Sequence, residues 1–223
     1  MAHQGTERIT IMRKMGMFIG LIALLGCSSA YYGTMEKLGY HKRDLMVNRV
    51  ESARDAQEEA KEEFESALEK FSSVLQFDGG KLEDKYNQLN SAYERSNARA
   101  ETVRERIESV EDVAEALFAE WEEELGQYSS ASLRRSSARK LSQTKRQYSK
   151  LINAMKRAER KMDPVLTAFH DQVLFLKHNL NAKAIASLQT ELGSVEAEVN
   201  SLIKDMEASI KEADVFISAM AKE

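Results

Sequence analysis

A continuous heptad pattern between Leu82 and Glu124 constrains this chain more than any other feature. Apolar and aromatic residues recur there at alternating spacings of three and four, and the residues between them are nearly all polar or charged. This pattern is typical of a long helix that buries one narrow stripe against other helices. At about 1.5 Å per residue, such a helix is roughly 65 Å long. The stripe consists of Leu82, Tyr86, Leu89, Tyr93, Ser96, Ala100, Val103, Ile107, Val110, Ala114, Leu117, Trp121 and Glu124.

Three further seams of the same kind fill the chain after residue 44. They run from Met46 to Val74, from Ser137 to Phe169 and from Ile185 to Met220. Short links separate the four seams, and short links place consecutive helices antiparallel. The expected fold is therefore all-α, an up-down antiparallel bundle or coiled coil of four helices over residues 44–223. The links are Asp78-Gly79-Gly80, Gly126 to Ser130, and His178 to Asn181.

Two local features bear on the third helix. Ser129 and Ser130 are both candidate N-caps, because a serine hydroxyl accepts a hydrogen bond from the first turn. Pro164 removes one backbone donor from the helix interior, which usually kinks or ends a helix. Because the seam passes from Met162 to Val165 without a skip, we expect a kinked but continuous helix. A fresh helix that starts at Asp163-Pro164 is the alternative.

Opposite charges are gathered in two blocks. Residues 101–124 are strongly acidic and residues 134–161 strongly basic, so a chain that folds back near Gln127 brings the blocks side by side. Such flanking charges set the orientation of paired helices. The alternative is that the basic face Arg134–Lys161 binds an anionic ligand, such as a lipopolysaccharide phosphate or an acidic protein. The candidate anion-binding residues are Arg134, Arg135, Arg139, Lys140, Lys145 and Arg146.

The N-terminal segment has the pattern of an export signal. Arg13 and Lys14 precede an apolar run over residues 15–25, which is shorter than the roughly 20 residues that span a bilayer. The only cysteine, Cys27, follows this run. The sequence Leu24-Leu25-Gly26-Cys27 resembles the lipobox of bacterial lipoproteins. The resemblance implies cleavage before Cys27 and acylation of its sulfur.

This interpretation divides the chain into a signal peptide at 1–26, a lipidated cysteine with a tether at 27–43, and the helical bundle. Met12 is an alternative start. Ser28, in place of an aspartate, favours by resemblance the outer membrane over the inner membrane. We therefore expect a periplasm-facing protein of the cell envelope. An ordinary signal peptide, or an apolar segment with a chance cysteine, is the alternative.

No motif in the sequence indicates a catalytic site. The chain lacks a phosphate-binding Gly-rich motif, a nucleophile elbow and a metalloprotease His-Glu pattern. A formal net charge of −4 gives no reason to expect nucleic acid as a partner. His170 and His178, with Asp163 and Asp171, are the candidate metal ligands, but helical histidines near a bundle end are more often structural. We expect no enzymatic activity, no cofactor and no metal.

A second resemblance covers most of the chain. The lipobox and the run from Met35 to Ala60, whose most specific part is Lys42-Arg43-Asp44, resemble a bacterial family of predicted lipoproteins that is labelled only as a domain of unknown function. The likeness extends to about Ser218. It implies an exported, helical, lipid-anchored protein, and it carries no activity and no site residues.

The expected function is accordingly a structural or protein-interaction role in the cell envelope, with a membrane attachment through the lipid and an unidentified protein partner. A homo-oligomer is equally compatible with the sequence, because a heptad seam serves packing within and between chains alike. The alternative function is a binding module for an anionic envelope ligand, using the basic face.

Overall fold

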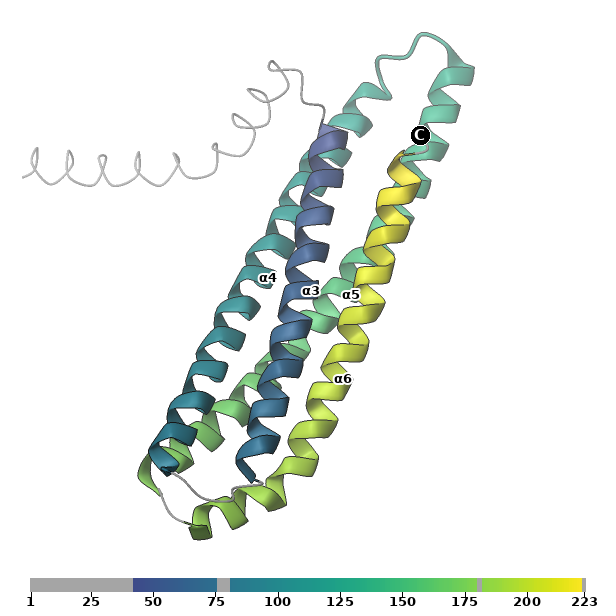
Figure 1. The fold of residues 1–223 in the computed structure, drawn as a ribbon. Helices are drawn as coiled ribbons and strands as arrows, with labels where there is room; N and C mark the ends of the chain where they lie inside the picture. The colour runs from purple at the N-terminus through teal and green to yellow at the C-terminus, as the bar shows by residue number, and fades with distance from the viewer. Residues whose placement is uncertain (1–41, 76–80, 180–181, 222–223) are drawn as a thin grey trace, which may run out of the picture. The chain divides into compact units, whose positions relative to one another are not determined.

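The structure is a computed structural model. Four α-helices make up nearly all of the residues that it describes. These residues are 42–75, 81–179 and 182–221, and no strand occurs among them. The helices are α3 (Lys42–Leu75), α4 (Leu82–Glu124), α5 (Ala131–His178) and α6 (Ala182–Ala221) (Figure 1). The chain divides into two compact units, residues 1–45 and 46–223. The first unit contains the first turn of α3, and the second contains the rest of the helices. The predicted all-α fold is confirmed.

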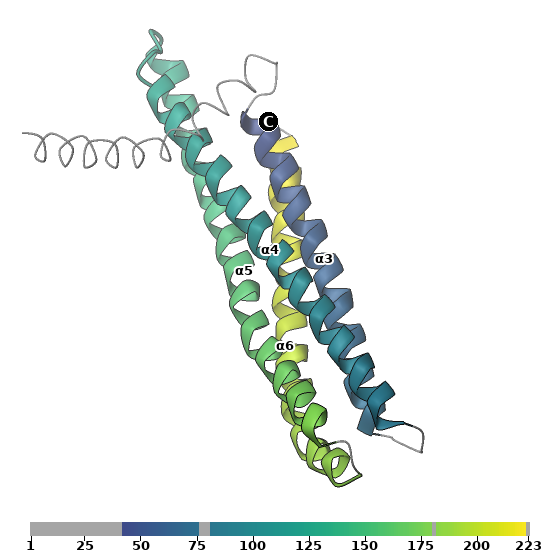
Figure 2. The same cartoon turned by 90° about the vertical axis from the view of Figure 1, so that its left-hand side faces the viewer.

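Ion pairs between neighbouring helices of the second unit show the antiparallel order. Glu63 and Glu59 of α3 pair with Arg95 and Arg99 of α4, so residue numbers rise along one helix as they fall along the other. The same reversal relates Glu111 and Glu122 of α4 to Lys156 and Lys145 of α5. In both Figure 1 and Figure 2 the four helices run side by side, as the short links require.

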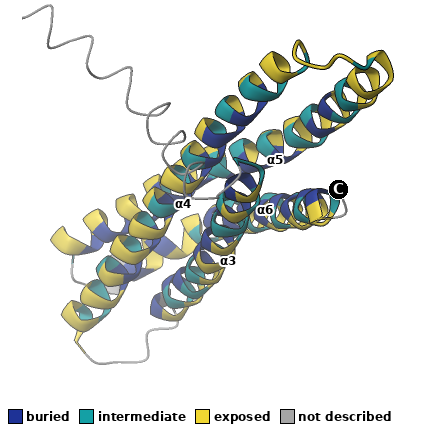
Figure 3. Cartoon of the chain, turned by 90° about the horizontal axis from the view of Figure 1, so that it is seen from above, coloured by how far each residue is buried: buried dark blue, intermediate teal, exposed yellow. Residues whose placement is uncertain are grey.

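The heptad seams form the core of this unit. All nine seam positions of α3 are buried, and α5 buries its seam without a break from Leu151 to Phe169. Seen from above, the buried faces of the helices turn toward one another (Figure 3). Phe71 of α3 stacks on Phe169 of α5 with the ring centroids 4.4 Å apart, and Phe64 lies 6.3 Å from the same ring. The core therefore joins α3 to α5 as well as joining sequential neighbours.

The buried face is wider than the heptad seams predict. Ala56, Val113, Phe118 and Leu166 lie outside the seams and are also buried. A helix in a four-helix bundle contacts two neighbours and the central axis, so it buries a wider stripe than a helix in a two-stranded coiled coil.

The link between α4 and α5 agrees with its sequence signals. Ser130 is the N-cap of α5, and its hydroxyl accepts a hydrogen bond from the Leu133 amide at 3.4 Å. The α5 helix is continuous through Pro164, which confirms the expected continuity and excludes a fresh helix at Asp163; the kink stays a prediction. The third link begins after His178, where α5 ends. The predicted turn Asp78–Gly80 and residues 180–181 lie outside the described residues.

Candidate interaction surfaces

The basic face of α5 divides into an exposed half and a neutralised half. Arg134, Arg135, Arg139 and Arg146 are exposed, and no acidic partner faces them among the described residues. Arg146 instead donates a hydrogen bond to the Ser142 hydroxyl at 2.7 Å. Four guanidinium groups on the N-terminal half of one helix are therefore open to an outside partner.

Cations farther along α5 are paired within the protein. The Lys156 ammonium lies 2.8 Å from a Glu111 carboxylate oxygen, as the charge blocks predict. Lys161 and Arg157 turn instead to Asp205 of α6, at 2.6 and 3.5 Å. The predicted pairing of the two blocks is thus confirmed for part of the basic block, while another part serves the α5–α6 contact.

Lys145 and Tyr148 border an aromatic cluster between α4 and α5. The Lys145 ammonium lies 2.7 Å from a Glu122 carboxylate oxygen and 5.4 Å from the centre of the Phe118 ring. Tyr148 meets the same ring edge-on at 5.4 Å. Burial raises the pKa of the Tyr148 phenol to about 12, and the carboxylates of Glu111 and Glu115 act in the same direction. A tyrosine held neutral to such high pH supports packing rather than proton transfer at neutral pH.

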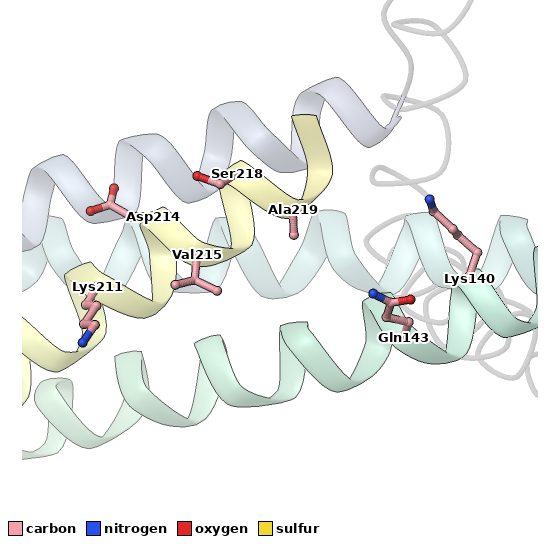
Figure 4. A pocket seen from close by; sticks show the side chains of 7 residues that line it. All are labelled: Lys140, Gln143, Lys211, Asp214, Val215, Ser218 and Ala219. Atoms are coloured by element: carbon pink, nitrogen blue, oxygen red, sulfur yellow. The ribbon is translucent and has the colours of Figure 1, made fainter. Parts of the chain in front are cut away.

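The largest of the described grooves lies between α5 and α6. It encloses about 640 Å³, and side chains from both helices form its walls (Figure 4). Lys140 and Gln143 come from α5, while Val215, which is 52% exposed, comes from α6. Asp214 on its rim accepts a hydrogen bond from Arg54 of α3 at 3.1 Å.

A smaller and more polar groove of about 360 Å³ lies between α4 and α5. Arg104, one of its lining residues, bridges Glu101 and Asp163, and the rings of Tyr93 and His170 pack with their centroids 5.3 Å apart. His170 lies 3.9 Å from Asp171. The described part of the chain contains no group of three or more His, Cys, Asp or Glu side chains placed to hold a metal ion.

Other predicted site residues cannot be compared with the structure. The lipobox residues Leu24, Leu25, Gly26 and Cys27 lie outside the described residues, as does most of the expected tether. Among the described helices, none combines the length and the apolar character that a membrane span needs.

Sequence reasoning missed the exposed tip of the α4–α5 hairpin, which we define as residues 119–140. The structure describes every residue of this tip, and none of them is buried. The two arms are joined by a 2.8 Å hydrogen bond from the Trp121 indole N–H to the Ser137 hydroxyl. Leu133 is 59% exposed and Tyr128 39% exposed. The sequence does contain a signal for this tip. The seams of both helices become polar here, because Glu124 and Ser137 stand at seam positions that are apolar elsewhere.

A comparison with known protein families found a matching family model. The model of a family described as "Protein of unknown function (DUF2959)" matches residues 31–220. The chain belongs to the DUF2959 family. The match covers the DUF2959 helices together with the residues just before them, and it confirms the expected domain-of-unknown-function label. No curated protein and no solved structure matches this DUF2959 chain.

Proposed function

We propose that this DUF2959 protein is a lipid-anchored component of a bacterial cell envelope with a structural or protein-interaction role and no catalytic activity. The observation that carries the proposal is the position of Cys27, the only cysteine, directly after an apolar run of signal-peptide length. Two basic residues before the run, Arg13 and Lys14, complete the pattern of an export signal. An acyl anchor contributes about 0.8 kcal/mol per buried methylene, and stable attachment needs more than one chain.

The character of the helices supports a scaffold rather than an enzyme. The described helices are apolar inside and charged outside, and the described grooves lie open between helices instead of enclosing convergent polar groups. Sites of catalysis usually combine a well-formed pocket with perturbed titratable groups. The proposed place of action is the periplasmic face of the outer membrane, because Ser28 rather than an aspartate follows Cys27 in the segment that resembles a lipobox.

The test is the intact mass and membrane fractionation of the natively expressed protein beside a Cys27→Ala variant. The natural protein should begin at Cys27, carry the added mass of acyl chains and sediment with membranes, and the variant should do none of these. Ser28→Ala is the matched control, because it changes the neighbouring residue, keeps the sulfur and should leave the lipid mass in place. A natural protein that retains Met1 with an unmodified Cys27 would refute the anchor and the envelope location together.

A second candidate function is the binding of an anionic envelope ligand through the basic face. It is supported by the exposure of Arg134, Arg135, Arg139 and Arg146, which find no acidic partner among the described side chains. Binding to lipopolysaccharide should then weaken with salt, as phosphate contacts of exposed cations do. Reversing Arg139 and Arg146 to glutamate should abolish retention on immobilised lipopolysaccharide. Reversal of Lys156, which is already paired with Glu111, should reduce retention much less.

A further inference from the structure

The tip of the α4–α5 hairpin continues the core pattern where no other helix that the structure describes covers it. Trp121 belongs to the α4 seam, Leu125 follows it at spacing four, and Leu133 precedes Ser137 at the same spacing on α5. In Figures 1 and 2 the α4–α5 connection lies beyond the last described turn of α6. Burial along α4 ends at Phe118 and resumes along α5 at Leu141. Among the described residues, the inner face of the tip therefore lacks the two further helices that cover the α4–α5 pair elsewhere in the bundle.

Charges on the tip are separated onto its two arms. The last turn of α4 contains Glu123 and Glu124, and the first turns of α5 contain Arg134 and Arg135. All four side chains are exposed, and no ion pair joins them to any residue that the structure describes. One arm is thus acidic, the other is basic, and each is open to an outside charge.

The placement of these charges opposes the dipoles of the helices. Carboxylates are unfavourable at the C-terminal end of a helix, and cations are unfavourable at the N-terminal end. α4 nevertheless has no basic residue in its last turn, and α5 has no acidic residue in its first turn. The charges at these two helix ends are therefore not those that the dipoles of their own helices favour, and an outside surface of opposite charge on each arm would stabilise both ends.

We propose that the hairpin tip is a self-association surface that pairs with the tip of a second copy of this chain. In a two-fold arrangement the acidic arm of each copy lies against the basic arm of the other, because the same surface is used by both copies. Trp121, Leu125 and Leu133 of the two tips then meet in a short four-helix core. A tip with equal numbers of opposite charges on separate arms is complementary to itself, whereas an anionic membrane would attract one arm and repel the other.

The experiment uses the full chain with Cys27→Ser, so that the result does not depend on the lipid anchor. Sedimentation equilibrium in a density-matched detergent, up to about 100 µM chain, should show a reversible dimer that weakens with salt. The variant Glu123→Lys/Glu124→Lys makes both arms basic, and Arg134→Glu/Arg135→Glu makes both arms acidic. Each variant alone should dimerise about 30-fold more weakly, since exposed ion pairs become repulsions in both halves of the interface.

Mixing the two variants gives the decisive result. Every arm then meets an arm of opposite charge, so the mixture should form a heterodimer of nearly natural affinity. Glu105→Lys/Glu108→Lys and Lys150→Glu/Arg160→Glu are matched reversals away from the tip, at exposed positions with no ion pair to any described residue, and they should leave the dimer unchanged. Leu133→Ala should weaken it several-fold while leaving the far-UV circular dichroism and the melting temperature of the monomer unaltered.

Other outcomes would overturn the proposal. A natural chain that stays monomeric throughout the concentration range refutes it directly. A mixture that does not recover association shows that the arms do not face each other across a two-fold axis. If Arg134→Glu/Arg135→Glu removes binding to anionic vesicles and Glu123→Lys/Glu124→Lys strengthens it, without any dimer, the tip meets a lipid surface instead.

Discussion

Ser209 of α6 donates a hydrogen bond to the side-chain carbonyl oxygen of Gln57 of α3 at 2.7 Å, and both residues are completely buried. Each is a polar residue in an otherwise apolar seam. The Gln57 amide nitrogen finds no hydrogen-bond partner among the described residues. A buried polar contact of this kind stabilises one alignment of two helices more than it stabilises the folded state, because a misaligned helix would leave both groups unpaired.

Removing one partner of this hydrogen bond should lower the free energy of unfolding more than removing both partners does. Ser209→Ala leaves a buried carbonyl without a donor, so the free energy of unfolding should fall by about 1–3 kcal/mol. Gln57→Leu/Ser209→Ala replaces the contact by apolar packing and should lie within about 1 kcal/mol of the natural protein, or above it. Urea denaturation of the four members of the double-mutant cycle measures these differences.

Thr144→Val is the matched control for that cycle. The Thr144 hydroxyl is also buried, but it donates to the Lys140 carbonyl of its own helix at 3.1 Å. Its loss breaks no contact between helices and should change stability by less than about 1 kcal/mol. If Gln57→Leu/Ser209→Ala and Ser209→Ala lose the same free energy of unfolding, the hydrogen bond between Gln57 and Ser209 has no role in aligning α3 with α6.

Asp205 should contribute more to stability than exposed carboxylates on the same bundle. Its side chain is 16% exposed and lies between Lys161 and Arg157, so Asp205→Asn should lower the free energy of unfolding by about 1–2 kcal/mol. Glu122→Gln is the comparison, because Glu122 is 59% exposed in its pair with Lys145 and its loss should change stability by about 0.5 kcal/mol or less. Chemical denaturation at low and high salt distinguishes the two, and a larger loss for Glu122→Gln would contradict the assignment.

Among the aromatic residues of α5, Phe169 should lose the most stability when it is replaced by alanine. Its ring is completely buried against Phe71, so Phe169→Ala should cost about 3–5 kcal/mol through lost burial and the cavity that remains. Phe175→Ala removes the same side chain from the same helix at a position that is 37% exposed, and should cost about 1 kcal/mol or less. Thermal denaturation followed by circular dichroism ranks the two variants. The reverse order would mean that α3 does not pack on α5 in solution.

Tyr148 should make the stability of the protein depend on pH in the alkaline range. Its pKa is about 12 in the folded protein and 10.0 in its ordinary state, so folding favours the neutral phenol. The stabilisation is complete below pH 10 and is lost as the pH rises from 10 toward 12. The free energy of unfolding should therefore fall less steeply over this interval for Tyr148→Phe than for the natural protein. Absorbance at 295 nm, with circular dichroism as the check on folding, should assign the highest tyrosine transition to this residue.

The secondary structure follows from the sequence alone because its determinants are local. Helical periodicity, the Ser130 cap and the unbroken spacing across Pro164 are properties of neighbouring residues, and the structure has the helices where these signals place them. The antiparallel order also follows from short links. The same reasoning could not give the full width of the buried face, since a residue outside the seams such as Phe118 is covered only when a neighbouring helix brings residues such as Tyr148 against it.

The sequence by itself determined four amphipathic helices, their order and their seams, because each depends on contacts within a few residues of the chain. Only the tertiary structure decided that Gln57 meets Ser209, that Lys161 turns to Asp205, and that no other described helix covers the α4–α5 tip. Those relationships depend on which distant helices adjoin and at what level each one ends. A heptad pattern specifies the face that a helix buries, but it does not specify the residues that this face meets.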